Sequence, residues 1–346
     1  MPDFRMREAM FKAPLGDDVF ADDPSVNALQ EHAAELLGFE AALFAPSGTQ
    51  TNLIALWGHC QRGDEAIVGQ SWHTYRWEAG GMAVLGSIQP QPVETQPDGT
   101  LRLADIAAAI KPDDPHFART RLVVLENTTG GQVLPPEYVA EVAQLARQRG
   151  LALHLDGARL FNAATANAAR RGTDVYQEAR ELASHFDSVS VCLSKGLGAP
   201  VGSLVLGSAA FIRQARRTRK ILGGGMRQAG VLAAAGHYAL QHHVRRLAED
   251  HANLHTLASG LRAVGENHPV LRGRITVHPW QTNILFTDVQ ADVAPAFTAW
   301  LAQHQIRVTS SLYGGQSRLR WVTHLDVNAA DVQAALDCVT RFTVPG

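Results

Sequence analysis

A single lysine follows an apolar run in the stretch SVSVCLSKGLGAPVGS, residues 188–203. The run predicts a buried strand, and Lys195 stands at its carboxyl end between Ser194 and Gly196. Such a lysine can be a surface amine, a phosphate ligand or a nucleophile that forms a Schiff base with an aldehyde. A Walker loop is excluded, because its glycines precede the lysine whereas these follow it. The stretch by itself does not decide whether Lys195 is a surface amine or a nucleophile.

A second segment, AALFAPSGTQTNLIALW at residues 41–57, predicts a strand, a Ser-Gly-Thr turn and a helix. Backbone N–H groups at a helix start, with the hydroxyls of Ser47 and Thr49 beside them and Gly48 between, can bind an anion such as phosphate. Ser47 and Gln50 also match the capping-box pattern S-x-x-Q. The segment therefore indicates either a phosphate site or an ordinary helix cap.

A third segment, HLDGARLF, places Asp156 at the end of an apolar strand and Arg159 three residues later. The carboxylate can pair with a cationic ring nitrogen, and the guanidinium can bind another carboxylate through two parallel hydrogen bonds. The alternative is an internal Asp–Arg ion pair combined with a helix N-cap. This motif alone does not separate the two interpretations.

Two further cations, Lys220 and Arg227, flank three successive glycines in RKILGGGMRQAG, residues 219–230. Glycines permit close approach of the backbone, so these cations can complete an anion site. His73 lies among aromatic residues in QSWHTYRWEAGG, a setting in which a lone histidine is usually structural. Together, a phosphate cup, an acid, a Schiff-base lysine and two cations match the requirements of one cofactor, pyridoxal 5′-phosphate (PLP).

The elements that position these residues alternate between strand and helix. Residues 122–127, 151–159, 187–194 and 203–208 predict strands, and PPEYVAEVAQLARQRG predicts a helix with prolines at its start and Gly150 at its C-terminal cap. Helices between short apolar strands predict an α/β fold with a mostly parallel sheet covered on both faces. Ligands of such sheets bind beyond the carboxyl ends of the strands, where Lys195 and Asp156 are expected.

The pattern changes after about residue 236, where a long helical stretch leads to ITVHPWQTNILFTDV and SRLRWVTHLD. We predict a large cofactor domain with an N-terminal arm at residues 1–235 and a smaller α+β domain at residues 236–346. The chain of 346 residues is long enough for two such cores.

Composition excludes several other classes of protein. Hydrophobic residues make up 46% and charged residues 18%, with a formal net charge of −2, which does not indicate a nucleic-acid partner. The one basic run, RQARRTRK at 213–220, suits a solvated helix or a small-anion site. Three cysteines without CxxC spacing predict neither a disulfide framework nor a bound metal. With no apolar run of membrane-spanning length and no signal peptide, we expect a cytoplasmic protein without a membrane partner.

Several stretches, in consistent order over nearly the whole chain, resemble the low-specificity L-threonine aldolases, a family within the β-eliminating lyases of PLP fold type I. They include PLGDDVFADDPSVNALQ, FAPSGTQTNLIAL, VGQSWHTYRWEAGG, LALHLDGARLFNA, CLSKGLGAPVGSLVLG and GGGMRQAGVLAAAG. The resemblance implies a lyase that cleaves L-threonine, L-allo-threonine and related β-hydroxy-α-amino acids to glycine and an aldehyde. It places the protein in amino-acid metabolism.

The resemblance also implies a role for each matching residue. Lys195 would hold PLP as a Schiff base, next to Ser194, and Asp156 would pair with the pyridinium nitrogen. Ser47, Gly48 and Thr49 would bind the phosphate. His73 would stack on the ring and move the proton of the substrate hydroxyl. Lys220 and Arg227 would reach the phosphate from a neighbouring subunit of a dimer or tetramer, and Arg159 and Arg320 would bind the substrate carboxylate.

Two positions depart from the family pattern. The family usually begins with a segment similar to LRSDTVTRP, whose serine lies near the substrate, whereas this chain begins MPDFRMREAM, so we expect one wall of the pocket to differ. Many members carry a histidine after ENT, where this chain has Thr129. Because threonine accepts no proton near neutral pH, we assign the base role to His73 or a water and expect the preference between threonine and allo-threonine to change.

Other functions remain consistent with the same residues. One is another PLP enzyme of this fold, such as a β-eliminating lyase or an aminotransferase, because the scaffold serves many reactions. Others are a non-catalytic protein of the same fold, or a small-anion or nucleotide binder that uses SGTQ and GGGM.

Overall fold

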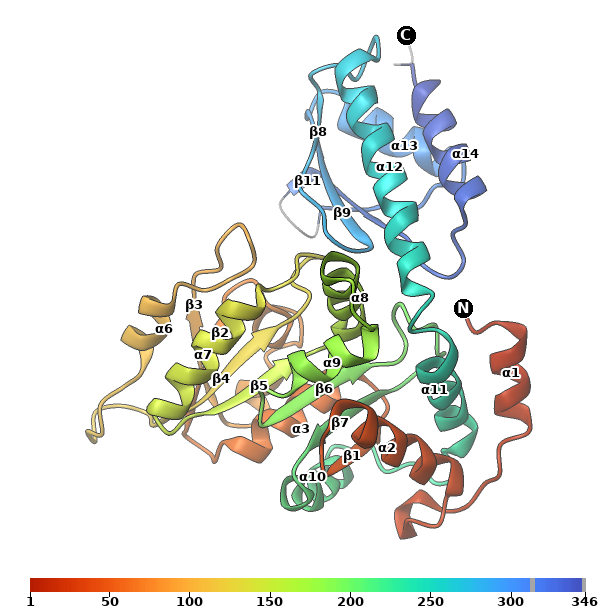
Figure 1. The fold of residues 1–346 in the computed structure, drawn as a ribbon. Coiled ribbons are helices and arrows are strands. Elements are labelled where there is room, and N and C mark those ends of the chain that lie inside the picture. The colour runs from red at the N-terminus through yellow and green to blue at the C-terminus, as the bar shows by residue number, and fades with distance from the viewer. Residues whose placement is uncertain (312–314, 344–346) are drawn as a thin grey trace. The chain divides into compact units, whose positions relative to one another are not determined.

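The computed structural model describes residues 1–311 and 315–343 (Figure 1). The chain divides into two compact units, one of residues 1–129 and 133–245 and the other of residues 130–132 and 246–346. The boundary expected at 235/236 falls within helix α11 (Gly230–His242).

The first unit contains a seven-stranded sheet in the order β1-β7-β6-β5-β4-β2-β3. Only β7, among the described strands of this sheet, runs antiparallel to its neighbours. The predicted α/β class with a mostly parallel sheet is confirmed. The strands are β1 (Ala41–Ala45), β2 (Glu65–Gly69), β3 (Gln89–Val93), β4 (Thr120–Glu126), β5 (Ala152–Asp156), β6 (Ser188–Cys192) and β7 (Ser203–Gly207).

Strands β2, β6 and β7 are continuous buried runs, as a sheet covered on both faces requires. Helix α3 packs on β1 and on β4 to β7, and α10 packs on β1 and β7. The helices of this unit are α1 (Phe4–Phe11), α2 (Pro24–Leu37), α3 (Gly48–His59), α4 (His73–Arg76), α5 (Gly81–Val84), α6 (Leu103–Ala109), α7 (Pro136–Gln148), α8 (Leu160–Arg171), α9 (Val175–Ala183), α10 (Ala209–Ile221) and α11. A 3₁₀ turn spans Asp18–Phe20.

Helix α7 illustrates how the local sequence sets an element. It begins with a proline at its first position, and it buries Val139, Val142, Ala143 and Ala146, four apolar residues at helical spacing. Gly150, with φ +62°, follows its end in the left-handed conformation that glycine tolerates. This prediction of a helix with its caps is confirmed.

The long helical stretch expected after residue 236 is interrupted at residues 243–246. The imidazole of His243, 3% exposed, bonds through Nδ1 to the Leu197 carbonyl (2.7 Å) and through Nε2 to the Asp3 carboxylate (3.0 Å). Asp3 also caps α1, which packs on α11. These tertiary hydrogen bonds override the local helical preference and end α11 at His242.

The second unit holds an antiparallel sheet in the order β10-β11-β9-β8 with helices around it. Its core includes Leu257, Leu261, Leu285, Phe297 and Trp321. Its elements are α12 (Leu247–Asn267), β8 (Ile275–Val277), β9 (Ile284–Val289), α13 (Ala294–Gln303), β10 (Thr309–Ser311), β11 (Gly315–Val322) and α14 (Ala329–Thr340).

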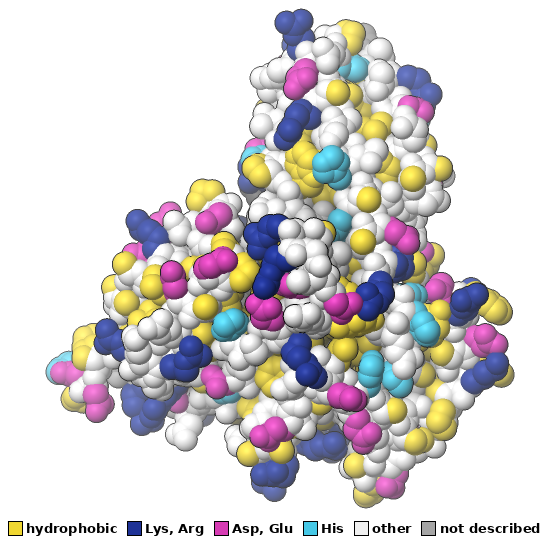
Figure 2. Space-filling view, viewed as in Figure 1, with side chains coloured by type: hydrophobic (Ala, Val, Ile, Leu, Met, Phe, Trp, Pro, Cys, Tyr) yellow, Lys and Arg dark blue, Asp and Glu magenta, His cyan; other side chains and the backbone are white. Residues whose placement is uncertain are grey.

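Charge on the surface is mixed, and on the face drawn in Figure 2 cationic and anionic side chains are interspersed. The basic run 213–220 lies on α10, where Arg219 turns inward and pairs with Asp18 at 2.7 Å. Among the described residues, no helix combines the length and apolar character needed to cross a bilayer.

Candidate active site

Five segments deliver polar side chains to one edge of the large sheet. Because β1, β2, β4, β5 and β6 run in the same direction, their carboxyl ends meet there. We call this side the carboxyl edge. Ser47, His73, Glu126, Asp156 and Lys195 lie at or just beyond these strand ends, which is the placement predicted for Ser47, Asp156 and Lys195.

Asp156 is the last residue of β5 and is 2% exposed. Its Oδ1 accepts a hydrogen bond from the backbone N–H of Ala158 (3.1 Å), and its Oδ2 accepts one from the side-chain amide of Asn52 (3.0 Å). Both partners are donors, so both carboxylate oxygens act as acceptors. Asn52, on α3, was not identified from the sequence.

Glu126 ends β4 and lies in register with Asp156 on the neighbouring strand. Burial, followed by the charge of Asp156, raises the pKa of Glu126 to about 7. Its Oε2 accepts the backbone N–H of His73 at 2.6 Å. Glu126 was not identified from the sequence, although its place at the end of the run LVVLE gives the same strand-end signal as Asp156.

His73 opens the short helix α4, and its Nδ1 lies 2.8 Å from Oε1 of Glu78. The hydrogen bond to Glu78 raises the pKa of His73 against the opposing effect of burial, and burial raises the pKa of Glu78. The ligand atoms of His73, Glu78 and Asp156 all lie within 4.8 Å of one another. We call Glu78, Glu126 and Asp156 the acid cluster; its charges act on one another.

Lys195 follows β6, in the turn that leads to β7, and is partly buried. Within residues 1–311 and 315–343 its amine has no hydrogen bond or ion pair, yet its charge lowers the pKa of both Glu126 and His73. An amine that acts electrostatically on Glu126 and His73 but is bonded to neither of them is available to a ligand. The neighbouring Ser194 is exposed.

The predicted anion cup forms the start of α3. The hydroxyl of Ser47 accepts the N–H of Gln50 at 3.2 Å, but the side chain of Gln50 donates to the Leu222 carbonyl instead of returning to Ser47. Only half of the alternative capping box is therefore formed. The N–H groups of Gly48 and Thr49, in the first helical turn, have no acceptor within the helix and point to the carboxyl edge.

Gly48 is required by its surroundings, because a Cβ there would lie 2.6 Å from Sγ of Cys192 and 3.5 Å from the hydroxyl of Ser203. The close approach packs the start of α3 against the end of β6 and the start of β7. It brings the cup next to the segment that carries Lys195.

Lys220 and Arg227 are both exposed. Arg227 pairs with Asp17 of the same chain at 2.6 Å. Between the two cations, Gly224 lies against Gln50, so closely that a Cβ would overlap the Gln50 amide. The glycine-rich segment thus contacts the helix that carries the cup.

Arg159 directly precedes α8, and its guanidinium, partly buried, has no ion pair in the described part of the chain. The alternative of an internal Asp156–Arg159 ion pair is therefore not observed. The hydroxyl of Thr129 donates to the Glu126 carbonyl at 3.0 Å, next to the acid cluster. Arg320 lies in the second unit, on β11, opposite Phe286 of β9 and Thr309 of β10.

The α/β fold is that of the enzymes of PLP fold type I. The model of the family described as "Beta-eliminating lyase" matches residues 2–292, and the chain belongs to that family.

Relatives with curated descriptions cover almost the whole chain. The "Low specificity L-threonine aldolase" of Escherichia coli O157:H7 is 51% identical over 327 residues, which cover 94% of this chain and 92% of that protein. The "Probable low-specificity L-threonine aldolase 2" of Arabidopsis thaliana is 42% identical, covering 99% and 94%. A threonine aldolase structure from Leishmania major, 22% identical, superimposes with a TM-score of 0.79 over 97% of this chain and 95% of that one, which supports the fold.

Proposed function

We propose that this protein is a PLP-dependent aldolase that cleaves L-threonine, L-allo-threonine and related β-hydroxy-α-amino acids to glycine and an aldehyde. The observation that carries the proposal is the convergence of the free Lys195 amine, the buried Asp156 carboxylate and the amides of the Ser47 turn on one edge of the sheet. The relatives described as threonine aldolases support the choice of reaction.

The residues at the carboxyl edge fit PLP by their chemistry. The cofactor needs an amine for its aldehyde, an acid for its ring nitrogen and donors for its phosphate. Lys195 offers the amine, Asp156 the acid, and the first-turn amides and hydroxyls of Ser47 and Thr49 the donors. When bound, PLP would supply the electron sink that the cleavage of the Cα–Cβ bond requires.

The protein's own groups would orient the substrate and move its protons. Arg159, whose guanidinium is free in the described structure, would bind the amino-acid carboxylate, together with Arg320. A substrate without that carboxylate would leave the partly buried Arg159 guanidinium without an ionic partner, at a cost of about 3 kcal/mol or more.

His73 would accept the proton of the β-hydroxyl at Nε2, since its Nδ1 is engaged by Glu78. Thr129, which holds the Glu126 carbonyl, would bind the hydroxyl without accepting its proton. A water molecule in place of His73 remains the alternative base.

An assay with the four stereoisomers of threonine tests the proposed reaction. Release of glycine and acetaldehyde in equal amounts from the L isomers, in the presence of PLP, is the expected result. A keto acid and ammonia would instead assign the protein to the β-eliminating lyases or aminotransferases of the same fold. The ratio of rates with L-threonine and L-allo-threonine measures the effect of Thr129.

We further propose that the active protein is a homodimer or homotetramer in which Lys220 and Arg227 complete the phosphate site of a neighbouring subunit. Their exposure and the contact of their segment with Gln50 support this assignment. Lys220→Ala should then weaken PLP retention. Mixing inactive Lys195→Ala with Lys220→Ala/Arg227→Ala should restore activity, because a hybrid dimer has one intact site; mixtures no more active than their components would contradict a shared site.

The expected setting is the cytoplasm. All three cysteines are free and buried thiols, a state that suits a reducing compartment.

A further inference from the structure

A row of polar side chains lies between α3 and the sheet, and it leads from one edge of the sheet to the other. It begins at His59, at the end of α3, continues through Ser188 of β6 and His154 of β5, and ends at Asn52 of α3. Asn52 then donates to Asp156 and Glu78 of the acid cluster. We call His59, Ser188, His154 and Asn52 the polar row.

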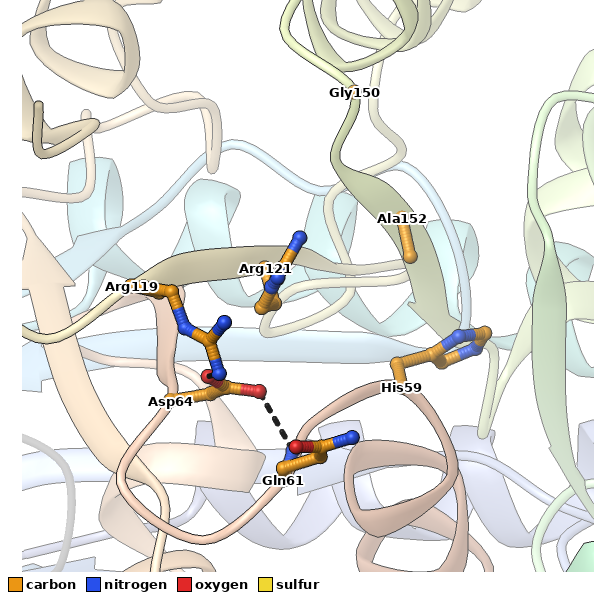
Figure 3. A pocket seen from close by; sticks show the side chains of 7 residues that line it. All are labelled: His59, Gln61, Asp64, Arg119, Arg121, Gly150 and Ala152. Atoms are coloured by element: carbon orange, nitrogen blue, oxygen red, sulfur yellow. Dashed lines mark hydrogen bonds and ion pairs between the residues drawn. The ribbon is translucent and has the colours of Figure 1, made fainter. Parts of the chain in front are cut away.

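The far end of the row is at the amino edge of the sheet. There His59 forms one wall of a cavity of about 330 Å³, beside Arg119 and Arg121 near the start of β4 and Ala152 at the start of β5 (Figure 3). Asp156 lies at the opposite end of β5. The row therefore spans the length of the strand.

The middle of the row is removed from water: Ser188 and His154 are 0% exposed and Asn52 is 2% exposed. Burying such groups costs stability unless they are hydrogen-bonded, so their mutual bonds are required by the fold. That requirement explains why they are paired, but it does not explain why the pairing ends on the acid cluster.

Both histidines are neutral near pH 7, because burial lowers the pKa of His154 to about 3 and that of His59 to about 4. A neutral imidazole has one N–H donor and one acceptor nitrogen, so the neighbours of each ring decide its tautomer.

The acid cluster fixes which atoms donate and which accept along the polar row. Asn52 uses its amide nitrogen for Asp156 (3.0 Å) and Glu78 (2.8 Å), so only its Oδ1 faces His154 Nε2, at 3.4 Å. His154 must then carry its proton on Nε2 and donate it to Asn52.

The remaining bonds follow from this tautomer. His154 Nδ1 accepts from the Ser188 hydroxyl at 2.8 Å, and that oxygen accepts from His59 Nε2 at 2.7 Å. The backbone carbonyl of Ser188, 3.1 Å from His154 Nδ1, competes by favouring a proton on Nδ1. In that competing state His154 Nε2 has no proton for Asn52, and the Asn52 amide is no longer held with its N–H groups toward the acids.

We propose that His154 is a positioning residue for Asp156: through Asn52 it keeps two amide N–H donors directed at Asp156 and Glu78, while Ser188 and His59 hold it in the required tautomer. The inference rests on the proposed function, since Asp156 is taken as the partner of the PLP ring nitrogen. Its consequence is that Asp156 stays an oriented acceptor and the ring nitrogen keeps its proton.

The test compares His154→Leu with His154→Gln in the PLP-loaded protein. Leucine removes the donor to Asn52, whereas the glutamine amide can replace it. With [¹⁵N]PLP as the probe, we expect the ring-nitrogen resonance of His154→Leu to move toward the unprotonated position and the PLP dissociation constant to rise about tenfold. His154→Gln should restore both values to near those of the wild type.

The Ser188→Ala variant tests the tautomer of His154 while His154 and Asn52 themselves stay unchanged. We expect the His154 side-chain ¹⁵N signals to show a shift of the proton from Nε2 to Nδ1, with weaker PLP retention in the same variant. The Ser188→Ala variant also tests the positioning role if the His154→Leu variant fails to fold. His268→Leu is the matched control, because His268 is a buried histidine of the second unit bonded to the Thr340 carbonyl, far from the row in sequence. It should lower stability and leave the ring-nitrogen resonance unchanged.

An unchanged ring-nitrogen resonance and PLP affinity in His154→Leu, or in Ser188→Ala if the former does not fold, would overturn the positioning role. A wild-type protein that binds PLP at Lys195 but releases no glycine would overturn the aldolase proposal alone. A wild-type protein that takes up no PLP would overturn both.

Discussion

Two glutamates of adjacent strands, the buried Glu65 and the partly buried Glu126, lie at opposite edges of the large sheet and in opposite electrostatic settings. Glu65 opens β2 at the amino edge, where it is 0% exposed. It is bonded to Lys111 (3.3 Å), the Thr120 hydroxyl (2.9 Å) and the Gln89 amide (2.9 Å). All three partners are donors, and one carries the opposite charge.

Glu126 ends β4 at the carboxyl edge, where its carboxylate accepts the N–H of His73 and Asp156 lies in register beside it. The nearby Lys195 forms no ion pair with it among the described residues. Fully partnered charges stabilise a fold, whereas like charges held together with a free amine cost stability and keep the groups available for chemistry. The same residue type is therefore structural at one edge and poised for function at the other.

The lysines of the two edges provide the largest expected contrast. Lys195→Ala should lower aldolase activity at least about a thousandfold and abolish the visible band of bound PLP, because the covalent anchor is lost. Lys111→Ala should keep the band and lower the free energy of unfolding by about 2 kcal/mol, because it leaves the buried Glu65 without its cation. Visible spectra and urea unfolding measure both effects. The contrast between the two edges would be contradicted if the Lys111→Ala variant were as stable as the wild type. It would also be contradicted if the Lys195→Ala variant kept its yellow colour and its activity.

The glutamates give a smaller, pH-dependent contrast. Because the pKa of Glu126 is raised from 4.5 to about 7, the folded chain keeps a proton between these pH values that the unfolded chain has released. The folded state then binds more protons, so this group makes the free energy of unfolding fall as pH rises from about 4.5 to about 7. Its favourable contribution is complete below 4.5 and lost above 7.

Glu126→Gln removes this titration while its side-chain oxygen can still accept the His73 N–H. The PLP-free variant should therefore gain stability relative to the wild type between pH 5 and pH 8, as measured by urea unfolding at several pH values. Glu65→Gln is the control at the other edge, and it should be less stable than the wild type at pH 7 because Lys111 loses its carboxylate. A constant difference between Glu126→Gln and the wild type over this range would show that Glu126 does not titrate there.

Much of the carboxyl edge was predictable because its signals are local. A lysine or aspartate at the end of an apolar run, and Ser-Gly-Thr between a strand and a helix, need only the rule that parallel strands present their carboxyl ends to ligands. Lys195, Asp156 and Ser47 were found in this way. Glu126 follows the same rule, because it is an acid at the end of the apolar run of β4, and it was predictable on the same grounds.

The residues that escaped prediction depend on contacts between distant segments. Asn52 lies within the apolar helix run TNLIAL, where nothing marks it as a partner of Asp156, which is 104 residues away. Glu78 is recognised only from the folded chain, in which its carboxylate bonds to His73 and both side chains lie close to Asp156. The interruption of the helix at His243 likewise requires Asp3 and Leu197, which the local sequence does not reveal.

The smallest effect we expect concerns Glu78, whose hydrogen bond is the main cause of the raised pKa of His73. Glu78→Gln keeps an oxygen for that hydrogen bond but removes the charge, so the pKa of His73 should fall. If His73 is the base, only its unprotonated ring can accept the proton. The acid limb of the plot of kcat/KM against pH should then move to lower pH, with only a few-fold change in kcat/KM at high pH.

Arg102→Gln, which breaks an exposed ion pair with Asp105, is the control and should leave the acid limb in place. An unmoved limb in Glu78→Gln would assign the base to a water, because Thr129 cannot accept a proton in this range.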